Sequence, residues 1–163
     1  MNPRQRRLAA DWETIRSEYS GHEAVTVEPQ GPFPPEEYLV TYQVPGLVRE
    51  ENQPAVANTH RVRIQLPLSY PRDAPYCVPL TPIFHPNIAE HYCIGDYWAA
   101  GEPLVDIIAK IGDMIQMRIY NTNSPLDIVA ARYVAANESL FPLGDVEIRP
   151  PDVEVVRGAA VDE

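Results

Sequence analysis

Residues 82–98 read Pro82-Ile83-Phe84-His85-Pro86-Asn87-Ile88-Ala89-Glu90-His91-Tyr92-Cys93-Ile94-Gly95-Asp96-Tyr97-Trp98. The stretch has neither a helical nor an alternating pattern of apolar residues, so the sequence predicts a loop. Cys93 lies within this loop, among histidine, asparagine, aspartate and glycine. A structural cysteine usually lies on a regular element with an apolar face, whereas a thiol in a polar loop can meet a reaction partner. We therefore take Cys93 as the first candidate for a reactive residue.

The overall composition is that of one globular domain. The 163 residues are 45% apolar and 22% charged, with a formal charge of −10. No apolar run approaches the roughly 20 residues that cross a bilayer, and the first residues lack the apolar stretch of a signal peptide. We expect a cytoplasmic protein with no membrane partner and with free thiols. The acidic charge argues against nucleic-acid binding, which needs a basic surface.

The region before the loop predicts one helix and four strands. Asn2 as the N-cap and Pro3 in the first turn begin the helix, which Gly21 ends. Its apolar stripe consists of Leu8, Trp12, Ile15 and Tyr19. The strands are predicted at residues 24–28, 37–43, 60–66 and, at a sheet edge, 76–80, where Cys77 is expected to be a core or edge residue. Short connections without helices between them indicate an antiparallel meander.

Two helices are predicted after the loop. Pro103 opens the first, whose apolar face consists of Leu104, Ile107, Ile108, Ile111 and Ile115. Ser124 and Pro125 have the pattern of a cap and first residue of the second, with Leu126, Val129, Ala130 and Tyr133 on its apolar face. Proline and acidic residues without a period follow. We therefore expect a domain at 1–144 and a loosely ordered tail at 145–163.

Several linked motifs resemble those of the ubiquitin-conjugating enzymes. They are Tyr70-Pro71 with Pro75, Pro82 to Ile88 with its His-Pro-Asn element, Cys93, Trp98, Asn121, and Ser124-Pro125-Leu126. The resemblance covers residues 2–137 and implies an α+β fold of the UBC type. That fold has an N-terminal helix, a four-stranded antiparallel meander, an active-site loop and then helices, two of which are expected here.

The resemblance also implies an activity and its partners. Cys93 would accept a ubiquitin-like protein from an activating enzyme as a thioester and transfer it to an amine of a target protein. No cofactor and no metal are implied. An alternative from the same resemblance is an inactive scaffold that binds a ubiquitin-like protein or a partner enzyme, although such variants typically lack the loop cysteine.

Roles for individual residues follow from the family's motifs. Asn87 matches the asparagine thought either to stabilise the developing oxyanion or to hold the loop in shape. Ser124 lies where the family carries Asp or Ser, and since it cannot act as a carboxylate base we expect it to position the incoming amine. We expect the remaining matched residues to support the loop: His85, Pro86, Trp98 and Asn121. His85 is expected to do so through hydrogen bonds to the backbone.

The chain departs from the family in spacing and composition. The intervals from the His-Pro-Asn element to Cys93 and from Cys93 to Trp98 are shorter than usual, and no counterpart of a fourth helix is evident. The chain is rich in arginine and alanine and has a single lysine, Lys110. A GC-rich genome or a need to avoid amines near a thioester would explain that lysine count. These features resemble the conjugating enzymes of bacterial ubiquitin-like modification operons of the Bil or Bub type, linked to phage defence.

Charge and residue type leave three further hypotheses. Arg4, Arg6 and Arg7 cluster near the N-terminus of an acidic protein and are predicted to dock the activating enzyme. A zinc site could use Cys93 with His85 and His91, and with Cys77 or His60, although no paired-ligand spacing is present. A Cys–His hydrolase could use His91 as its base, but no third orienting group is evident.

Overall fold

The first helix, α1 (Pro3–Tyr19), begins where the sequence predicts. The structure, a computed structural model, describes residues 1–149. The Asn2 side chain accepts a hydrogen bond from the Gln5 amide (2.8 Å), and the Gln5 side chain accepts one from the Asn2 amide (3.0 Å). This reciprocal pair satisfies two amides that the first helical turn leaves without a partner. Leu8, Ile15 and Tyr19 are buried, as predicted.

The central sheet is an antiparallel meander of four strands in the order β1-β2-β5-β6. Its strands are β1 (Val25–Gln30), β2 (Glu37–Tyr42), β5 (His60–Gln65) and β6 (Tyr76–Pro79). In the register, Val40 lies opposite Val62 and Tyr38 opposite Ile64, and all four side chains are buried. The predicted meander is confirmed, and its inner face supplies one half of the core.

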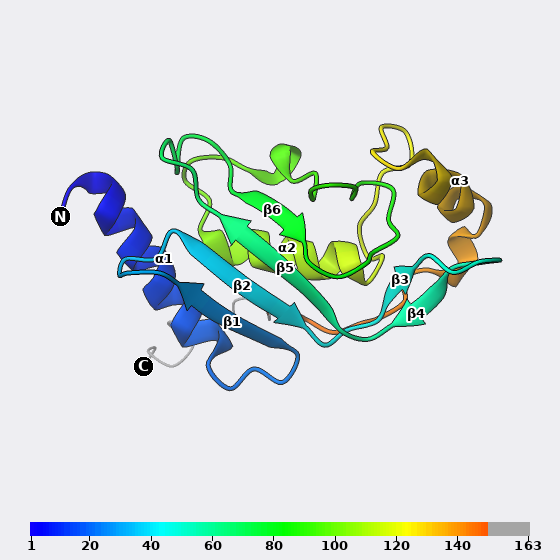
Figure 1. The fold of residues 1–163 in the computed structure, drawn as a ribbon, viewed down its shortest axis with the longest axis horizontal. Coiled ribbons are helices and arrows are strands. Elements are labelled where there is room, and N and C mark those ends of the chain that lie inside the picture. Colours follow the sequence, from blue (N-terminus) through cyan, green and yellow to red (C-terminus); the bar gives the residue numbers. More distant parts are fainter. Residues whose placement is uncertain (150–163) are drawn as a thin grey trace, which may run out of the picture.

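The second helix, α2 (Leu104–Ile115), supplies the other half of the core. Figure 1 shows it lying across one face of the sheet, with α1 beside β1. The predicted apolar face is fully buried: Leu104, Ile107, Ile108, Ile111 and Ile115. The buried Tyr42 hydroxyl donates to the carbonyl of Ile108 (2.7 Å), which ties the sheet to the helix. A short 3-10 helix, η1 (Gly95–Tyr97), precedes α2 and closely follows Cys93.

The sequence did not predict a small hairpin formed by β3 (Gly46–Val48) and β4 (Ala55–Ala57). Strands of three residues are too short to show an alternating pattern. The hairpin lies beside α3 (Ile128–Ala136) in Figure 1. Leu47, Phe84 and Ala130 form a second, small core between these elements. This core joins the start of the Cys93 loop to the third helix.

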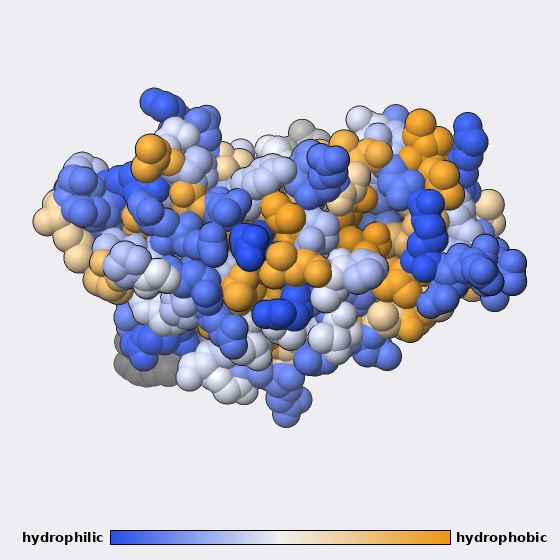
Figure 2. All heavy atoms as spheres, viewed as in Figure 1, coloured by the Kyte–Doolittle hydropathy of each residue, from blue (hydrophilic) through white to orange (hydrophobic). Residues whose placement is uncertain are grey.

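The prediction that Ser124 caps the third helix is wrong, because α3 begins three residues later. Asp127 is the N-cap, and its side chain accepts a hydrogen bond from the Ala130 amide (3.0 Å). The amides of Leu126 and Asp127 instead donate to the carbonyl of Pro86 (2.8 and 3.1 Å), which keeps this segment irregular. Leu126 and Val129 are therefore exposed rather than buried, at 41% and 56%. Figure 2 shows apolar side chains gathered toward the α3 end of this face of the molecule.

The segment after α3 returns to the core through a second 3-10 helix, η2 (Glu138–Leu140). The fully buried Gln116 side chain donates to the Val146 carbonyl and accepts from the Val146 amide, both at 3.0 Å. Ile148 is also buried, at 1% exposure. The expected loosely held tail therefore does not begin at Asp145, because residues 145–149 pack on the domain. The rest of that tail, residues 150–163, lies outside the described residues.

Among residues 1–149, no helix combines the length and the apolar character that crossing a bilayer requires.

Candidate active site

His85 fixes the first turn of the loop that carries Cys93. Its side chain is fully buried, and both ring nitrogens have backbone partners. Nδ1 accepts from the Asn87 amide (2.9 Å), and Nε2 lies 3.0 Å from the Ile119 carbonyl, to which it donates. Burial lowers the pKa of His85 to about 4, so the ring is neutral at physiological pH. With both nitrogens occupied, His85 is arranged as a structural residue and not as a base.

Asn87 joins two segments that are distant in sequence. Its side-chain Nδ2 donates to the carbonyls of Asn121 (2.9 Å) and Ser124 (3.4 Å), and its Oδ1 accepts from the Asn121 amide (2.8 Å). Its backbone carbonyl accepts from the Cys93 amide (3.0 Å). One nearly buried residue thus holds the backbone of Cys93 against the 121–124 segment.

Cys93 lies at a small cavity between the loop and the 121–124 segment. The cavity measures about 70 Å³. Its lining residues are Asn87, Cys93, Tyr97, Met114, Ile119, Asn121 and Ser124. The structure therefore brings together the predicted residues Cys93, Asn87, Asn121 and Ser124. Met114 and Ile119 were missed, because as apolar residues near the end of α2 they have the sequence pattern of ordinary core positions.

The two cysteines have opposite environments. Cys93 is exposed, whereas Cys77 is 1% exposed within β6. Burial raises the pKa of the Cys77 thiol far above its usual range, so Cys77 stays protonated and unreactive. The carbonyl of Cys77 accepts a hydrogen bond from the Tyr92 amide (2.9 Å), which pins the loop to the sheet directly before Cys93. Of the two cysteines, Cys93 has the accessible thiol.

Trp98 holds the chain on the other side of Cys93. Its indole nitrogen donates to the carbonyl of Pro71 (3.1 Å), and its ring packs on Tyr70 with 5.5 Å between centroids. Trp98 does not line the Cys93 cavity. Its contacts with Pro71 and Tyr70 therefore lie outside the cavity.

Arg7 and Asp11 form an ionic cluster beneath Trp98 that the sequence did not predict. Asp11 is 5% exposed and accepts hydrogen bonds from Arg7 (2.9 Å), from the Tyr70 hydroxyl and from the Leu104 amide at the start of α2 (3.2 Å). The Arg7 guanidinium lies 5.8 Å from the Trp98 ring centroid. It also donates to the carbonyls of Ala100 (2.6 Å) and Glu102, in the segment after η1.

The three N-terminal arginines therefore do not form one free docking surface. Arg7 points into the cluster described above. The side chain of Arg4 is 22% exposed, pairs with Glu36 (2.5 Å) and donates to the Pro67 carbonyl (2.9 Å). Arg6 is exposed and donates to the carbonyl of Met1 (2.7 Å). Charge clustering in the sequence overstated the available positive surface, because two of the three guanidinium groups have partners elsewhere in the domain.

The positions of the histidines and cysteines can be compared with the two alternative hypotheses, a zinc site and a Cys–His hydrolase. Among the described side chains of residues 1–149, which do not include that of Asp96, no three His, Cys, Asp or Glu side chains lie close enough together to hold a metal ion. His91 stacks on Tyr76 with 5.7 Å between ring centroids, and the described part of the chain contains no hydrogen bond between His91 and Cys93. His85 is committed to backbone groups. No Cys–His pair is thus assembled around Cys93 in the described residues.

Comparisons with known proteins agree with the family that the sequence motifs resemble. The family model for Ubiquitin-conjugating enzyme matches residues 47–143, which is more than half of the chain. The E2 domain of a Toxoplasma gondii ubiquitin conjugating enzyme aligns with a TM-score of 0.60 at 20% identity, over 85% of this chain and 90% of its own. A Plasmodium yoelii protein assigned as a ubiquitin conjugating enzyme gives 0.63 at 18% identity, over 86% and 89%. At such identities the likeness establishes the fold. No curated protein matches the chain.

Proposed function

This chain belongs to the ubiquitin-conjugating enzyme family, and we propose that it carries a ubiquitin-like protein as a thioester on Cys93. The observation that carries the proposal is the exposed Cys93 thiol at a cavity shared with Asn87, while the other cysteine is buried. The Cys93 sulfur attacks the carbonyl carbon of the activating enzyme's thioester, and the activating enzyme's thiol leaves. An amine of the target then attacks the new thioester, forming an amide and releasing Cys93.

We assign Asn87 to positioning. A side-chain amide has two N–H donors, and in this structure both point at backbone carbonyls of the 121–124 segment. Its contribution to the reaction is then to hold the Cys93 backbone and the opposite wall of the cavity in register. Asn121 contributes its backbone amide and carbonyl to the same contact.

We assign Ser124 to the path of the incoming amine. Its side chain is exposed and lines the cavity. The Asn87 contact uses the Ser124 carbonyl, so the hydroxyl is available to an amine. In Ser124→Ala, loading of Cys93 is expected to be unchanged and transfer to a free amine to slow by less than about tenfold, since one neutral hydrogen bond contributes about 1 kcal/mol. Unchanged transfer would exclude a role for the hydroxyl.

The decisive experiment is loading of Cys93. The protein is incubated with an activating enzyme, its ubiquitin-like protein and ATP, and the products are separated with and without reductant. A reductant-sensitive adduct is expected in the wild type and in Cys77→Ala, and none in Cys93→Ala. Full loading of Cys93→Ala would exclude Cys93 as the acceptor. If the wild type binds the ubiquitin-like protein but never forms an adduct, the inactive-scaffold alternative holds instead.

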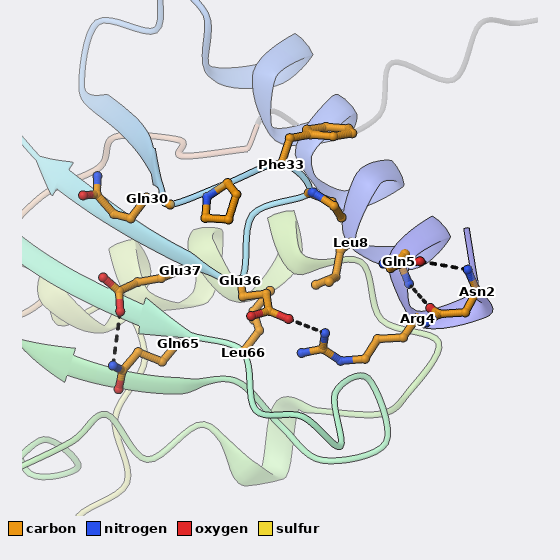
Figure 3. A pocket seen from close by; sticks show the side chains of 13 residues that line it. Asn2, Arg4, Gln5, Leu8, Gln30, Phe33, Glu36, Glu37, Gln65 and Leu66 are labelled. Atoms are coloured by element: carbon orange, nitrogen blue, oxygen red, sulfur yellow. Dashed lines mark hydrogen bonds and ion pairs between the residues drawn. The ribbon is translucent and has the colours of Figure 1, made fainter.

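We propose that the activating enzyme docks at the N-terminal end of α1. This end borders a groove of about 620 Å³ between the helix and the β1–β2 turn. Figure 3 shows Arg4 and Glu36 paired within it, Asn2 and Gln5 at one end, and the exposed Phe33 on the turn. Arg6→Glu is expected to weaken loading without affecting stability, because Arg6 is exposed. Arg16→Glu on the last turn of α1 is the matched charge control, and equal effects of the two variants would contradict docking at this end.

We further propose that the modifier is a ubiquitin-like protein of a bacterial system of the Bil or Bub type, acting in the cytoplasm. The single lysine, the arginine-rich composition and the short interval between Asn87 and Cys93 support this narrower assignment. Loading by the activating enzyme of such an operon, but not by a eukaryotic one, is the expected result. The proposed domain contains residues 1–144 at least, and residues 145–149 pack on it.

A further inference from the structure

Lys110 is the only lysine among the 163 residues. The lysine amine is a nucleophile that attacks thioesters once it loses its proton, whereas the arginine guanidinium stays protonated and does not. In a chain that carries a thioester, the position of this one amine relative to Cys93 decides whether the protein can acylate its own side chain.

Lys110 is connected to the Cys93 cavity through Tyr97. Its ammonium nitrogen is 5.4 Å from the centroid of the Tyr97 ring. Tyr97, in η1, also lines the cavity that contains Cys93. Lys110 and Tyr97 together line a neighbouring cleft of about 530 Å³ on the surface of α2. One aromatic side chain is thus in contact with both the thiol cavity and the only lysine of the protein.

The cleft around Lys110 contains groups that can take up a proton. It is also lined by three carboxylates, Glu102, Asp106 and Asp113, and by Arg149. Asp106 is paired with Arg149. Burial raises the pKa of Asp113, against the opposing effect of Arg118 and Lys110. Asp113 is therefore a better proton acceptor than an ordinary carboxylate and lies close enough to Lys110 to be affected by its charge.

We propose that Lys110 is a self-modification site, which accepts the acyl group of the ubiquitin-like protein from the Cys93 thioester of the same chain. The proposal rests on the proposed function. The amine gives up one proton to Asp113 or to water, and its nitrogen attacks the thioester carbonyl. The C–N bond forms and the C–S bond breaks. The sulfur leaves with the bonding electron pair and takes up the second proton of the amine, so an amide and a free thiol result.

A purely structural role for Lys110 predicts a different behaviour. As a cation over the Tyr97 ring, it could serve only to hold η1 in place. Arginine keeps this charge and its interaction with the ring but has no nucleophilic amine. Lys110→Arg therefore separates the two roles within one substitution.

The test loads the protein with a ubiquitin-like protein, removes ATP, and follows adducts with and without reductant in the absence of any target. The wild type is expected to convert its reductant-sensitive adduct into a reductant-resistant one, mapped to Lys110 by mass spectrometry. Lys110→Arg is expected to load equally well and to form no resistant adduct. A control, Lys110→Arg with Arg16→Lys, puts the single lysine on α1, which lines neither the Cys93 cavity nor the Lys110 cleft.

Each outcome decides the proposal. The proposal is overturned if the wild type is loaded but forms no resistant adduct, or if a resistant adduct persists in Lys110→Arg. It is also overturned if the adduct forms equally at position 16 of the control, because the position of the lysine would then be irrelevant. If Cys93 is not loaded at all, both the proposed function and this inference are excluded. Mixing loaded Lys110→Arg with unloaded Cys93→Ala shows whether the transfer occurs between molecules. An adduct on Cys93→Ala at the wild-type rate would overturn transfer within one chain.

Discussion

Two anchors of different chemistry hold the chain on either side of Cys93. The upstream anchor consists of His85 and Asn87, which are neutral and bond to backbone groups. The downstream anchor consists of Arg7, Asp11, Tyr70 and Trp98, and contains a largely buried ion pair. The neutral anchor directly contacts the Cys93 backbone, whereas the ionic anchor connects α1 to the segment after η1.

We expect one of these two anchors to determine the geometry of the Cys93 site and the other to determine the stability of the fold. A neutral network beside the thiol keeps the same hydrogen bonds across physiological pH, so the cavity does not change shape with protonation. A buried ion pair is costly to break, since removal of one partner leaves a charge with little water around it. We therefore expect the downstream anchor to dominate the free energy of unfolding and the upstream anchor to dominate transfer from Cys93.

The largest expected effect is on the downstream anchor. Asp11→Ala removes the acceptor for Arg7, Tyr70 and the first amide of α2, and should lower the free energy of unfolding by about 3 kcal/mol. Urea denaturation measures this loss. Glu13→Ala is the control on the same helix, because its pair with Arg16 is exposed. It should change stability by less than about 0.5 kcal/mol. Similar losses in both variants would contradict the assigned importance of Asp11.

Acid should weaken the upstream anchor. The unfolded chain protonates His85 near its ordinary pKa of about 6.5, but the folded protein does so only near pH 4. Between these values the unfolded state binds more protons, so stability falls as pH is lowered. We expect a loss of about 2 kcal/mol between pH 7 and pH 5.

Denaturation of the wild type and of His85→Asn at both pH values tests this expectation. Burial also lowers the pKa of His60, which adds a loss of the same sign in both proteins. The difference between the two proteins therefore reports on His85. Equal acid sensitivity of wild type and variant would show that His85 does not titrate as its burial implies.

Asn87→Ala should separate transfer from stability most clearly. It removes the side-chain contacts to Asn121 and Ser124, but water can replace them because the 121–124 segment is partly exposed. The free energy of unfolding should fall by about 1.5 kcal/mol. Transfer from Cys93 to a free amine should slow much more than in any downstream variant. Asn123→Ala, a neighbouring exposed position, is the control, and an equal slowing there would contradict the role of Asn87.

The smallest expected effect is that of Trp98→Phe. Phenylalanine keeps the packing on Tyr70 but cannot donate to the Pro71 carbonyl, which should lower the free energy of unfolding by about 1 kcal/mol. Discharge of Cys93 onto a free amine should keep its wild-type rate. Slowed discharge would mean that the downstream anchor also sets the geometry of the thiol.

The sequence predicted the regular elements well because their apolar patterns are long. The α2 stripe from Leu104 to Ile115 and the alternation in β5 each extend over several residues and identify their buried faces without ambiguity. Cys77 was predicted as a core or edge residue from its apolar neighbours Tyr76 and Val78, and it is buried. The hairpin of β3 and β4 was missed because each strand has only three residues.

The errors arose where tertiary contacts override a local pattern. Ser124-Pro125 is a good helix start in isolation, but Asn87 and Pro86 form hydrogen bonds with the backbone of the 124–127 segment. The N-cap of the helix is therefore Asp127. Arg7 resembled a surface charge, yet its partner Tyr70 is 63 residues away in sequence. The only local signal of that cluster was the spacing of Arg7 and Asp11, four residues apart on one helix.

The contacts of the Gln116 side chain also indicate which residues a shortened chain must retain. It bonds to Val146 in the manner of a strand pair, although Gln116 itself lies at the end of a helix. A chain cut after residue 144 would leave this amide without its Val146 partners and would remove Ile148 from the core. A fragment for expression or crystallisation should therefore end no earlier than Arg149, whose guanidinium also binds Glu18 of α1.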